Sequence, residues 1–512
     1  MSTHRSRGPM LAPIGPIATR RSTRTDSRSG FWLAGAVVLM IDVGLLALGN
    51  ALGLGTITGL VAIPVMLLAL VPILRYESGA GRGFDSAGLV FFAFSVKVLG
   101  AFGRLYMVDE IYDGNGDSSS YHLWGTRLAE SFRGLDFDVD PGRPIPGTGF
   151  IRVSTGVIYA LVGTNKFVGF LVYSMLGFIG VYLLFVAFAT AVPTGHLKRY
   201  GLLIFLWPTM SFWPSAIGKE AWMMFALGLG AWGTSRLLVH KRGGVTALVV
   251  GLLAMYAVRP HVAILLVAAV AVGVIINALF RSGDGVRSFG FASKMGSVVL
   301  LVVLASLLAP RVATFLNVDD VGGSGFSSAL ESVQARTDEG GSNFDAADID
   351  SIVDYPWAFI TVIFRPFPWE VTNAQSAVTA LEGLVLAGLL FFSIRRLARL
   401  PVEAIKRPYA AAAAAYVFMF CYVFAFVGNF GILARQRSQL LPFVFVLVAL
   451  PLTERARTRA RPGPYPRDGG GSDDGPSAEG GETDRPSGES ARARQSGLNI
   501  VTAGIGPPSR RR

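Results

Sequence analysis

The sequence predicts an all-α polytopic membrane protein with about twelve transmembrane helices. Of its 512 residues, 52% are hydrophobic and only 16% are charged, whereas a soluble domain carries about one quarter charged residues. Several apolar stretches are long enough to cross the hydrocarbon core as helices, which takes about 20 residues each. The net charge of +12 is concentrated in the two tails and the short loops, which predicts contact with the lipid bilayer and no nucleic-acid partner.

The chain divides into a membrane-embedded domain, residues 31–452, and two polar tails. Residues 1–30 contain six Arg and one Asp, and residues 453–512 are rich in Gly, Pro, Ser and Arg. Neither tail has the apolar pattern that builds a core, so both are predicted to be disordered and cytoplasmic. The single Cys421 excludes an intrachain disulfide and a zinc site made of cysteines.

Apolar stretches place the helices in order along the chain. The first, residues 31–54, is too long for a signal-peptide core and has no clear small-residue cleavage site, so it is predicted to be retained. The other spans are predicted at 57–74, 86–108, 167–191, 201–215, 220–239, 245–258, 261–280, 296–310, 378–394, 409–427 and 439–452. Within the polar segment that follows the third span, residues 118–132 are also predicted to be helical.

The six residues Gly-Leu-Gly-Ala-Trp-Gly at 228–233 match a dinucleotide-binding fingerprint. They lie inside an apolar helix with no preceding strand, whereas the fingerprint requires a strand before its glycines. We therefore interpret them as small residues that pack helices against one another.

The basic loops predict the orientation in the membrane. With the N-terminus in the cytoplasm, about twelve spans put every short basic loop and both termini inside. The inward basic residues are Arg75, Arg82, His196, Lys198, Arg199, His240, Lys241, Arg242, Arg281, Arg287, Lys294, Arg395, Arg396, Arg399, Lys406 and Arg407. Two long polar loops, 109–150 and 311–377, are then extracytoplasmic.

The acidic stretch Asp109–His122 is the predicted catalytic segment. It contains Asp109, Glu110, Asp117 and His122 directly after an apolar run. Acids at the mouth of a helix bundle can accept a proton, hold a divalent cation or bind a sugar. The alternative for this stretch alone is a solvated loop, because residues 114–116 are turn formers.

Basic residues on the same outer face predict an anion-binding site. The positive-inside bias does not explain them, because it places basic residues on the other face. The candidates for substrate and phosphate binding are Lys219, Glu220, Arg259, His261, Arg365, Arg435 and Arg437. Arg365 ranks first, since the following Pro-Phe-Pro constrains its backbone. Taken singly, Lys219 could pair with Glu220, and Arg259 could reach lipid phosphates.

Two charged residues lie near the middles of predicted spans, Asp42 in the first and Lys97 in the third. Charges at that depth are costly unless they are paired. This predicts a structural ion pair in preference to a proton pathway.

The outer acidic motif also resembles a known family. Asp-Glu followed by Gly-Asp-Ser-x-x-Tyr-His, in the first long outer loop of a many-helix bundle, resembles the membrane glycosyltransferases of the GT-C class. The resemblance covers roughly residues 86–240 and implies that an acid of this loop is the catalytic base and that the sugar donor is a polyprenyl phosphate. For the base we rank Asp109 first and Asp117 second, with His122 in support. In that class the loop follows the first helix, whereas here it follows the third. Residues 212–220 also resemble bacterial membrane proteins encoded near polysaccharide genes.

These features predict an enzyme of a bacterial-type plasma membrane that transfers a sugar from a polyprenyl-phosphate donor to an envelope glycan, lipid or protein. Its active site would be extracytoplasmic, with a divalent cation as a candidate cofactor. An O-antigen-type polysaccharide polymerase has a similar predicted topology and is the first alternative. A lipid-linked oligosaccharide transporter is the second, and it would need charges along an internal cavity.

The orientation can be tested by labelling cysteines in whole cells. Cysteines that replace Ser119 and Ser327 should react with a membrane-impermeant maleimide, whereas a cysteine that replaces Ser22 should not. Labelling at Ser22 without labelling at Ser119 would invert the orientation and move the site to the cytoplasm.

Overall fold

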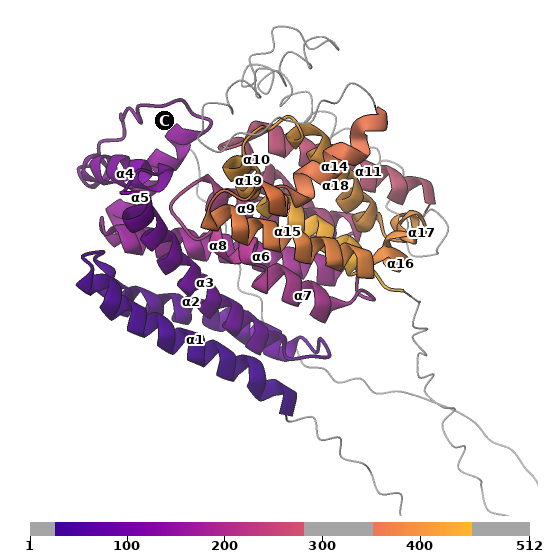
Figure 1. Cartoon of the computed structure of the whole chain (residues 1–512), viewed down its shortest axis with the longest axis horizontal. Helices are drawn as coiled ribbons and strands as arrows, with labels where there is room; N and C mark the ends of the chain where they lie inside the picture. Colours follow the sequence, from indigo (N-terminus) through magenta and orange to yellow (C-terminus); the bar gives the residue numbers. More distant parts are fainter. Residues whose placement is uncertain (1–25, 281–351, 453–512) are drawn as a thin grey trace, which may run out of the picture. The chain divides into compact units, whose positions relative to one another are not determined.

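The structure, a computed structural model, describes residues 26–280 and 352–452, all within one unit of the chain, Met1–Arg455. In these ranges the regular structure is helical and contains no β-strand (Figure 1). Six of the described helices are long and apolar enough to cross a membrane. The predicted class, an all-α membrane protein, is therefore confirmed for this part of the chain, while the number of about twelve spans stays a prediction.

The helices within residues 26–280 follow the predicted order. They are α1 (Asp26–Ala51), α2 (Gly59–Gly79), α3 (Ser86–Tyr106), α4 (Asp117–Arg133), α5 (Thr148–Val162), α6 (Lys166–Ala191), α7 (Leu197–Leu206), α8 (Pro208–Phe212), α9 (Lys219–Leu238), α10 (Gly244–Tyr256) and α11 (Pro260–Phe280). A single turn, η1 (Thr56–Thr58), precedes α2, and a π-helical turn, η2 (Met107–Ile111), follows α3. The helix predicted at 118–132 is confirmed as α4.

The helices within residues 352–452 form the C-terminal part of the bundle. They are α14 (Tyr355–Phe364), α15 (Ala374–Phe392), α16 (Ile394–Leu397), α17 (Leu400–Lys406), α18 (Pro408–Phe424) and α19 (Phe430–Val448), with the short turns η3 (Ile352–Asp354) and η4 (Pro368–Glu370). The span predicted at 296–310, most of the polar loop 311–377 and the tails 1–25 and 453–512 lie outside the described residues. Helix α1 begins at Asp26, before the predicted start of the first span at residue 31, because a helix can extend past its apolar stretch.

Glycines bring α6, α9 and α10 into backbone contact. A Cβ atom placed on Gly228 of α9 would lie 2.2 Å from the carbonyl oxygen of Gly180 on α6. Toward α10, a Cβ atom on Gly233 would lie 2.3 Å from the amide nitrogen of Leu248. Small residues permit this close approach between membrane helices, so the predicted helix-packing role of residues 228–233 is confirmed.

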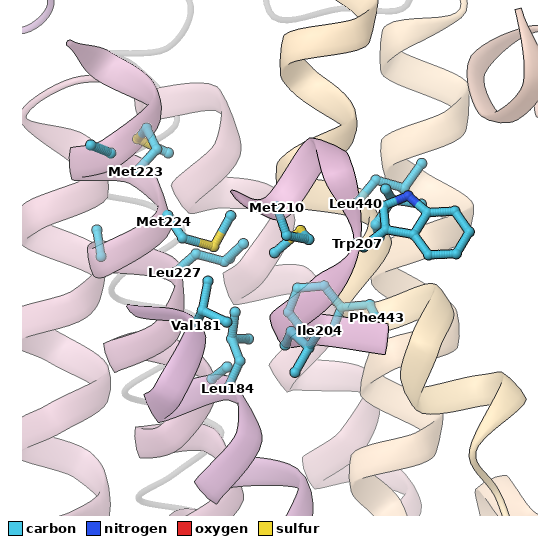
Figure 2. Packing of buried hydrophobic residues seen from close by; sticks show 14 of the residues in the cluster. Val181, Leu184, Ile204, Trp207, Met210, Met223, Met224, Leu227, Leu440 and Phe443 are labelled. Carbon is cyan, nitrogen blue, oxygen red and sulfur yellow. The ribbon is translucent and has the colours of Figure 1, made fainter. Parts of the chain in front are cut away.

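The predicted span 201–215 is not one continuous helix. It breaks between α7 and α8 at Trp207, whose φ of −67° and ψ of 130° are extended, because the residue before a proline disfavours the helical conformation. The side chains around the break still pack as a core: Figure 2 shows Ile204, Trp207 and Met210 among residues of α6, α9 and α19. Hydropathy does not register a break inside an apolar segment, whereas Pro208 marks its place in the sequence.

Two charged side chains bind the backbone of α8, just beyond this break. The Lys97 ammonium donates a hydrogen bond to the Met210 carbonyl at 3.0 Å. The Glu382 carboxylate of α15 accepts hydrogen bonds from the Thr209 amide at 2.9 Å and from the Thr209 hydroxyl. Backbone polar groups in a bilayer have to find partners within the protein, and these side chains supply them.

The predicted ion pair between Asp42 and Lys97 is wrong. Lys97 donates to α8, and neither carboxylate oxygen of Asp42 has a hydrogen-bond partner among the described residues. The carbonyl near the helix break gives Lys97 a partner that the sequence does not reveal.

The glycine contacts give a stability prediction. Gly228→Ala should lower the free energy of unfolding by about 1–3 kcal/mol, because the added methyl group meets backbone that has no room to move aside. Thermal unfolding in detergent, followed by loss of monodisperse protein, would measure the change.

The matched control is Gly44→Ala on α1, where a Cβ atom has no neighbour within 4 Å. This variant should unfold at or slightly above the wild-type temperature, since Ala is the better helix former. Equal unfolding temperatures for the Gly228 and Gly44 variants would contradict the packing described here.

Candidate functional site

A cavity of about 440 Å³ is enclosed by the C-terminal end of α3 and the N-terminal ends of α4, α9, α15 and α19. The charged and larger polar side chains of its lining are Arg104, Tyr112, Asn115, Asp117, Tyr121, Glu220, Asn373, Gln375 and Arg435. Helix N-termini carry partial positive charge and unpaired N–H groups. The cavity therefore combines acids and bases with a field that favours anions.

Two of these helix ends lack a side-chain cap. Gly116 precedes α4 and Gly218 precedes α9; both glycines line the cavity, and neither helix has a side-chain cap hydrogen bond. By contrast, Asn373 caps α15 and Asn429 caps α19 through their side chains. Uncapped N-termini are ready-made sites for phosphate or carboxylate groups.

Arg104 of α3 is a buried cation in the cavity wall. The residue is 8% exposed, and its guanidinium carbon lies 4.8 Å from the centroid of the Trp213 ring and 5.2 Å from that of the Phe212 ring. Among the described residues its Nε has no hydrogen-bond partner and its guanidinium forms no ion pair. A buried charge is costly without a counter-charge, so Arg104 is suited to hold an anion.

Sequence reasoning missed Arg104 because the residue lies inside a predicted span. One signal could have found it. Arg104 lies near the C-terminal end of the third span. In the predicted orientation this is the outer end of the span, where basic residues are sparse.

Asp117 and Arg435 are brought together across the cavity. Asp117 opens α4 and Arg435 lies on the second turn of α19; Asp117 Oδ2 is 3.5 Å from Arg435 Nη1. The Asp117 side chain is 73% exposed, so its carboxylate is accessible to a bound molecule. A loose, exposed pair of this kind contributes little to stability.

Glu220 lines the cavity and pairs with Arg259 behind it. The two side chains are 3.0 Å apart, and they are 15% and 10% exposed, respectively. Glu220 is therefore paired with Arg259, and the alternative pair of Lys219 with Glu220 is not formed. Lys219 and His261 lie next to these residues in the sequence but do not line the cavity.

Asp109 and His122 belong to a polar cluster beside the cavity. The Asp109 carboxylate pairs with Lys166 at the start of α6, and Lys166 also donates to the Ser119 hydroxyl at 3.0 Å. His122 Nδ1 lies 2.8 Å from the Tyr159 hydroxyl. Burial and the Lys166 ammonium lower the pKa of His122, although Asp109 opposes the shift, so the imidazole is neutral at pH 7. Glu110 is exposed.

The remaining predicted cations are engaged elsewhere. Arg365 Nε donates to Glu370 at 2.8 Å, while the next residue, Pro366, lines the cavity. Arg437 is 2% exposed and its Nε donates to the Val362 carbonyl at 3.0 Å. Of the predicted site residues, the cavity lining thus holds Asp117, Glu220 and Arg435.

Within residues 26–280 and 352–452, no three His, Cys, Asp or Glu side chains converge in a way that could hold a metal ion. The cations of the cavity wall are arginines, which bind oxyanions through paired N–H groups. The residues present fit an anion better than a divalent cation.

Comparison of the chain with protein families, curated proteins and solved structures finds no match.

The Glu220–Arg259 pair gives a second stability prediction. Glu220→Gln should lower the free energy of unfolding by about 3 kcal/mol, because it leaves the Arg259 charge largely buried without its partner. Thermal unfolding in detergent would measure this loss.

The control is Glu110→Gln, which removes an equally charged but exposed side chain nearby. Its unfolding temperature should stay near the wild-type value. A Glu220 variant as stable as the Glu110 variant would show that the pair does not contribute to folding.

Proposed function

We propose that the protein is a membrane glycosyltransferase that transfers a sugar from a polyprenyl-phosphate donor to an acceptor hydroxyl at the outer face of the bilayer. The observation that carries the proposal is the cavity itself. It holds an accessible carboxylate, Asp117, together with Arg104 and Arg435 and two uncapped helix ends. Such a site can accept a proton on one group while it binds phosphate on others.

The position of the cavity supports a lipid-borne donor. Helix α3 has 21 residues, which corresponds to about 30 Å, the thickness of the hydrocarbon core. Arg104 lies one turn from its C-terminal end, so the cavity is at a membrane interface. In the predicted orientation with about twelve spans this interface is extracytoplasmic, where a polyprenyl phosphate is available and a nucleotide sugar normally is not.

In the proposed reaction the acceptor oxygen bonds to the anomeric carbon of the sugar while the bond from that carbon to the phosphate oxygen breaks. The phosphate leaves with the electron pair, and its negative charge is stabilised by Arg104, Arg435 and the amides of α4 and α9. Asp117 accepts the proton of the acceptor hydroxyl. All bonds and charges balance without a further reactant.

Asp117 is a better base than Asp109, although the sequence ranked Asp109 first. Asp109 is tied to Lys166 and does not line the cavity, whereas Asp117 lines it and is largely exposed. The Asp109 carboxylate is therefore less accessible to an acceptor hydroxyl than the Asp117 carboxylate. Asp109, Lys166 and His122 would then position α4.

The transporter alternative would draw on the buried charges Lys97 and Arg437 and on the partly buried Glu382. Lys97 and Glu382 bind the backbone of α8, and Arg437 binds the Val362 carbonyl. None of the three lines the cavity, so they do not form a charged path for a substrate. An O-antigen-type polymerase would use the same cavity with a longer lipid-linked substrate.

The test incubates purified protein with a panel of polyprenyl-phosphate sugars and follows release of the lipid phosphate. Asp117→Asn should lower turnover by about 10²–10⁴-fold, and Arg104→Gln by about 10²–10³-fold. The control, Asp113→Asn, changes an exposed acid of the same loop that does not line the cavity and should leave turnover unchanged.

The other outcomes separate the alternatives. Extension of a pre-assembled lipid-linked repeat, without use of any single-sugar donor, would establish the polymerase. Movement of lipid-linked glycan across vesicle membranes without any reaction would establish the transporter. Full turnover of Asp117→Asn would exclude this residue as the base.

A further inference from the structure

A second cavity lies at the opposite end of α3. It has a volume of about 860 Å³ and is lined by the α2–α3 connection, the α6–α7 connection, the first turns of α7 and Leu389 of α15. The first cavity is at the C-terminal end of the same helix, 21 residues away, which is about 30 Å. The two cavities are therefore at opposite interfaces of the bilayer.

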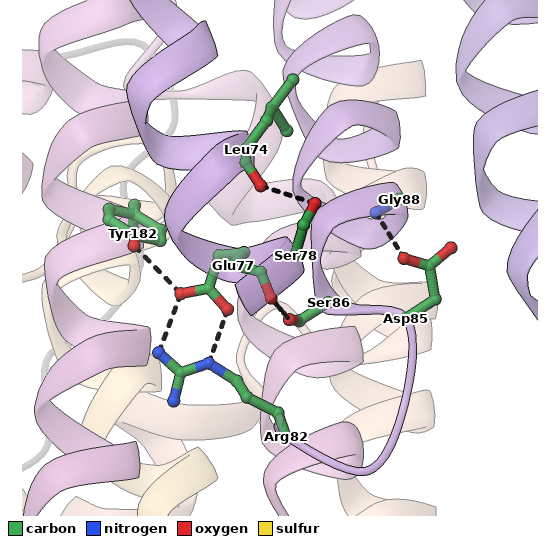
Figure 3. A network of polar contacts seen from close by, with 8 residues as sticks. All are labelled: Leu74, Glu77, Ser78, Arg82, Asp85, Ser86, Gly88 and Tyr182. Carbon is green, nitrogen blue, oxygen red and sulfur yellow. Dashed lines mark hydrogen bonds and ion pairs between the residues drawn. The ribbon is translucent and has the colours of Figure 1, made fainter. Parts of the chain in front are cut away.

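The charged residues that line this second cavity are all basic. Arg82 comes from the α2–α3 connection, His196 from the α6–α7 connection, and Lys198 and Arg199 from the first turn of α7. Arg82 is neutralised in place, because its Nε and Nη2 donate to Glu77 at 2.5 and 2.8 Å and Tyr182 also donates to Glu77 (Figure 3). Arg82 and Glu77 thus form the fixed wall of the cavity.

Lys198 and Arg199 supply positive charge that no carboxylate of the described residues offsets. Arg199 Nη2 donates to the Ser393 hydroxyl at 2.6 Å, which fixes the guanidinium at the end of α15. Lys198 is exposed at the cavity rim. Neither residue forms an ion pair within the described parts of the chain.

The wall below these cations is apolar. Leu202 and Leu203 of α7 and Leu389 of α15 line the cavity and are only partly buried. A free anion needs only the cations, whereas a phospholipid also needs apolar surface for its acyl chains. Basic pockets between membrane helices on the cytoplasmic side bind anionic lipid head groups.

We propose that this cavity binds the phosphate of an anionic phospholipid, with Lys198 and Arg199 on the head group and the three leucines against an acyl chain. The positive-inside rule accounts for basic residues on this side of the membrane. It does not require that they line one cavity together with three leucines. The site is separate from the proposed reaction and does not depend on it.

The test measures the binding of a fluorescent phosphatidylglycerol to the full-length protein in detergent. The double variant Lys198→Gln/Arg199→Gln should bind it at least tenfold more weakly, since each basic residue contributes to the attraction. The control is Lys241→Gln/Arg242→Gln, which removes the same charge from the α9–α10 connection, outside the cavity, and should bind like the wild type. Loss of Arg199 could harm folding, so the single variant Lys198→Gln, which changes an exposed side chain, is measured as well. It should also bind the lipid more weakly than the wild type.

Competition identifies the ligand. Unlabelled phosphatidylglycerol should displace the probe, whereas phosphatidylcholine and inorganic phosphate at equal concentration should not. Displacement by inorganic phosphate would overturn the proposal in favour of a free-anion site. Equal weakening in both double variants, or displacement by phosphatidylcholine, would overturn it in favour of general attraction to lipid.

Discussion

The structure depends on how the protein stabilises a break between two of its helices. Pro208 has no backbone N–H, and the residue before it is extended, so α7 cannot continue into α8. In a bilayer the backbone groups near such a break need partners inside the protein. Lys97 of α3 and Glu382 of α15 provide them, and the two charged side chains thereby fix three segments that are distant in the sequence.

The segment that follows the break also builds part of the candidate site. Helix α8 and the residues after it pass close to α3 and α6, because a Cβ atom on Gly100 would lie 2.4 Å from the Ser211 carbonyl and one on Gly177 would lie 2.5 Å from the Pro214 carbonyl. It then places Trp213 and Gly218 in the cavity wall. The segment between α8 and α9 thus leads to the uncapped start of α9, and its Trp213 supplies an aromatic face to Arg104.

The two ends of α3 use arginine in different ways. At one end Arg82 is matched by Glu77, and this ion pair holds the α2–α3 connection. At the other end Arg104 lies against two aromatic rings and has no carboxylate partner among the described residues. The aromatic faces partly compensate the buried charge without neutralising it. Arg104 therefore retains its capacity to bind an anion, whereas Arg82 does not.

Hydropathy and small-residue spacing act locally along the chain, so they were enough to predict the class of the protein, the order of most helices and the packing role of Gly228–Gly233. Asp117, Glu220 and Arg435 were candidates for the same reason, since all three are polar residues next to apolar runs. The folded arrangement of the helices was needed to show that Asp117 meets Arg435, that Asp109 pairs with Lys166 and that Glu220 pairs with Arg259. Such pairings depend on which helix ends meet in space, and side-chain type does not encode that. Arg104 was missed for the same reason, because its aromatic neighbours come from a segment whose path is set by the break at Pro208.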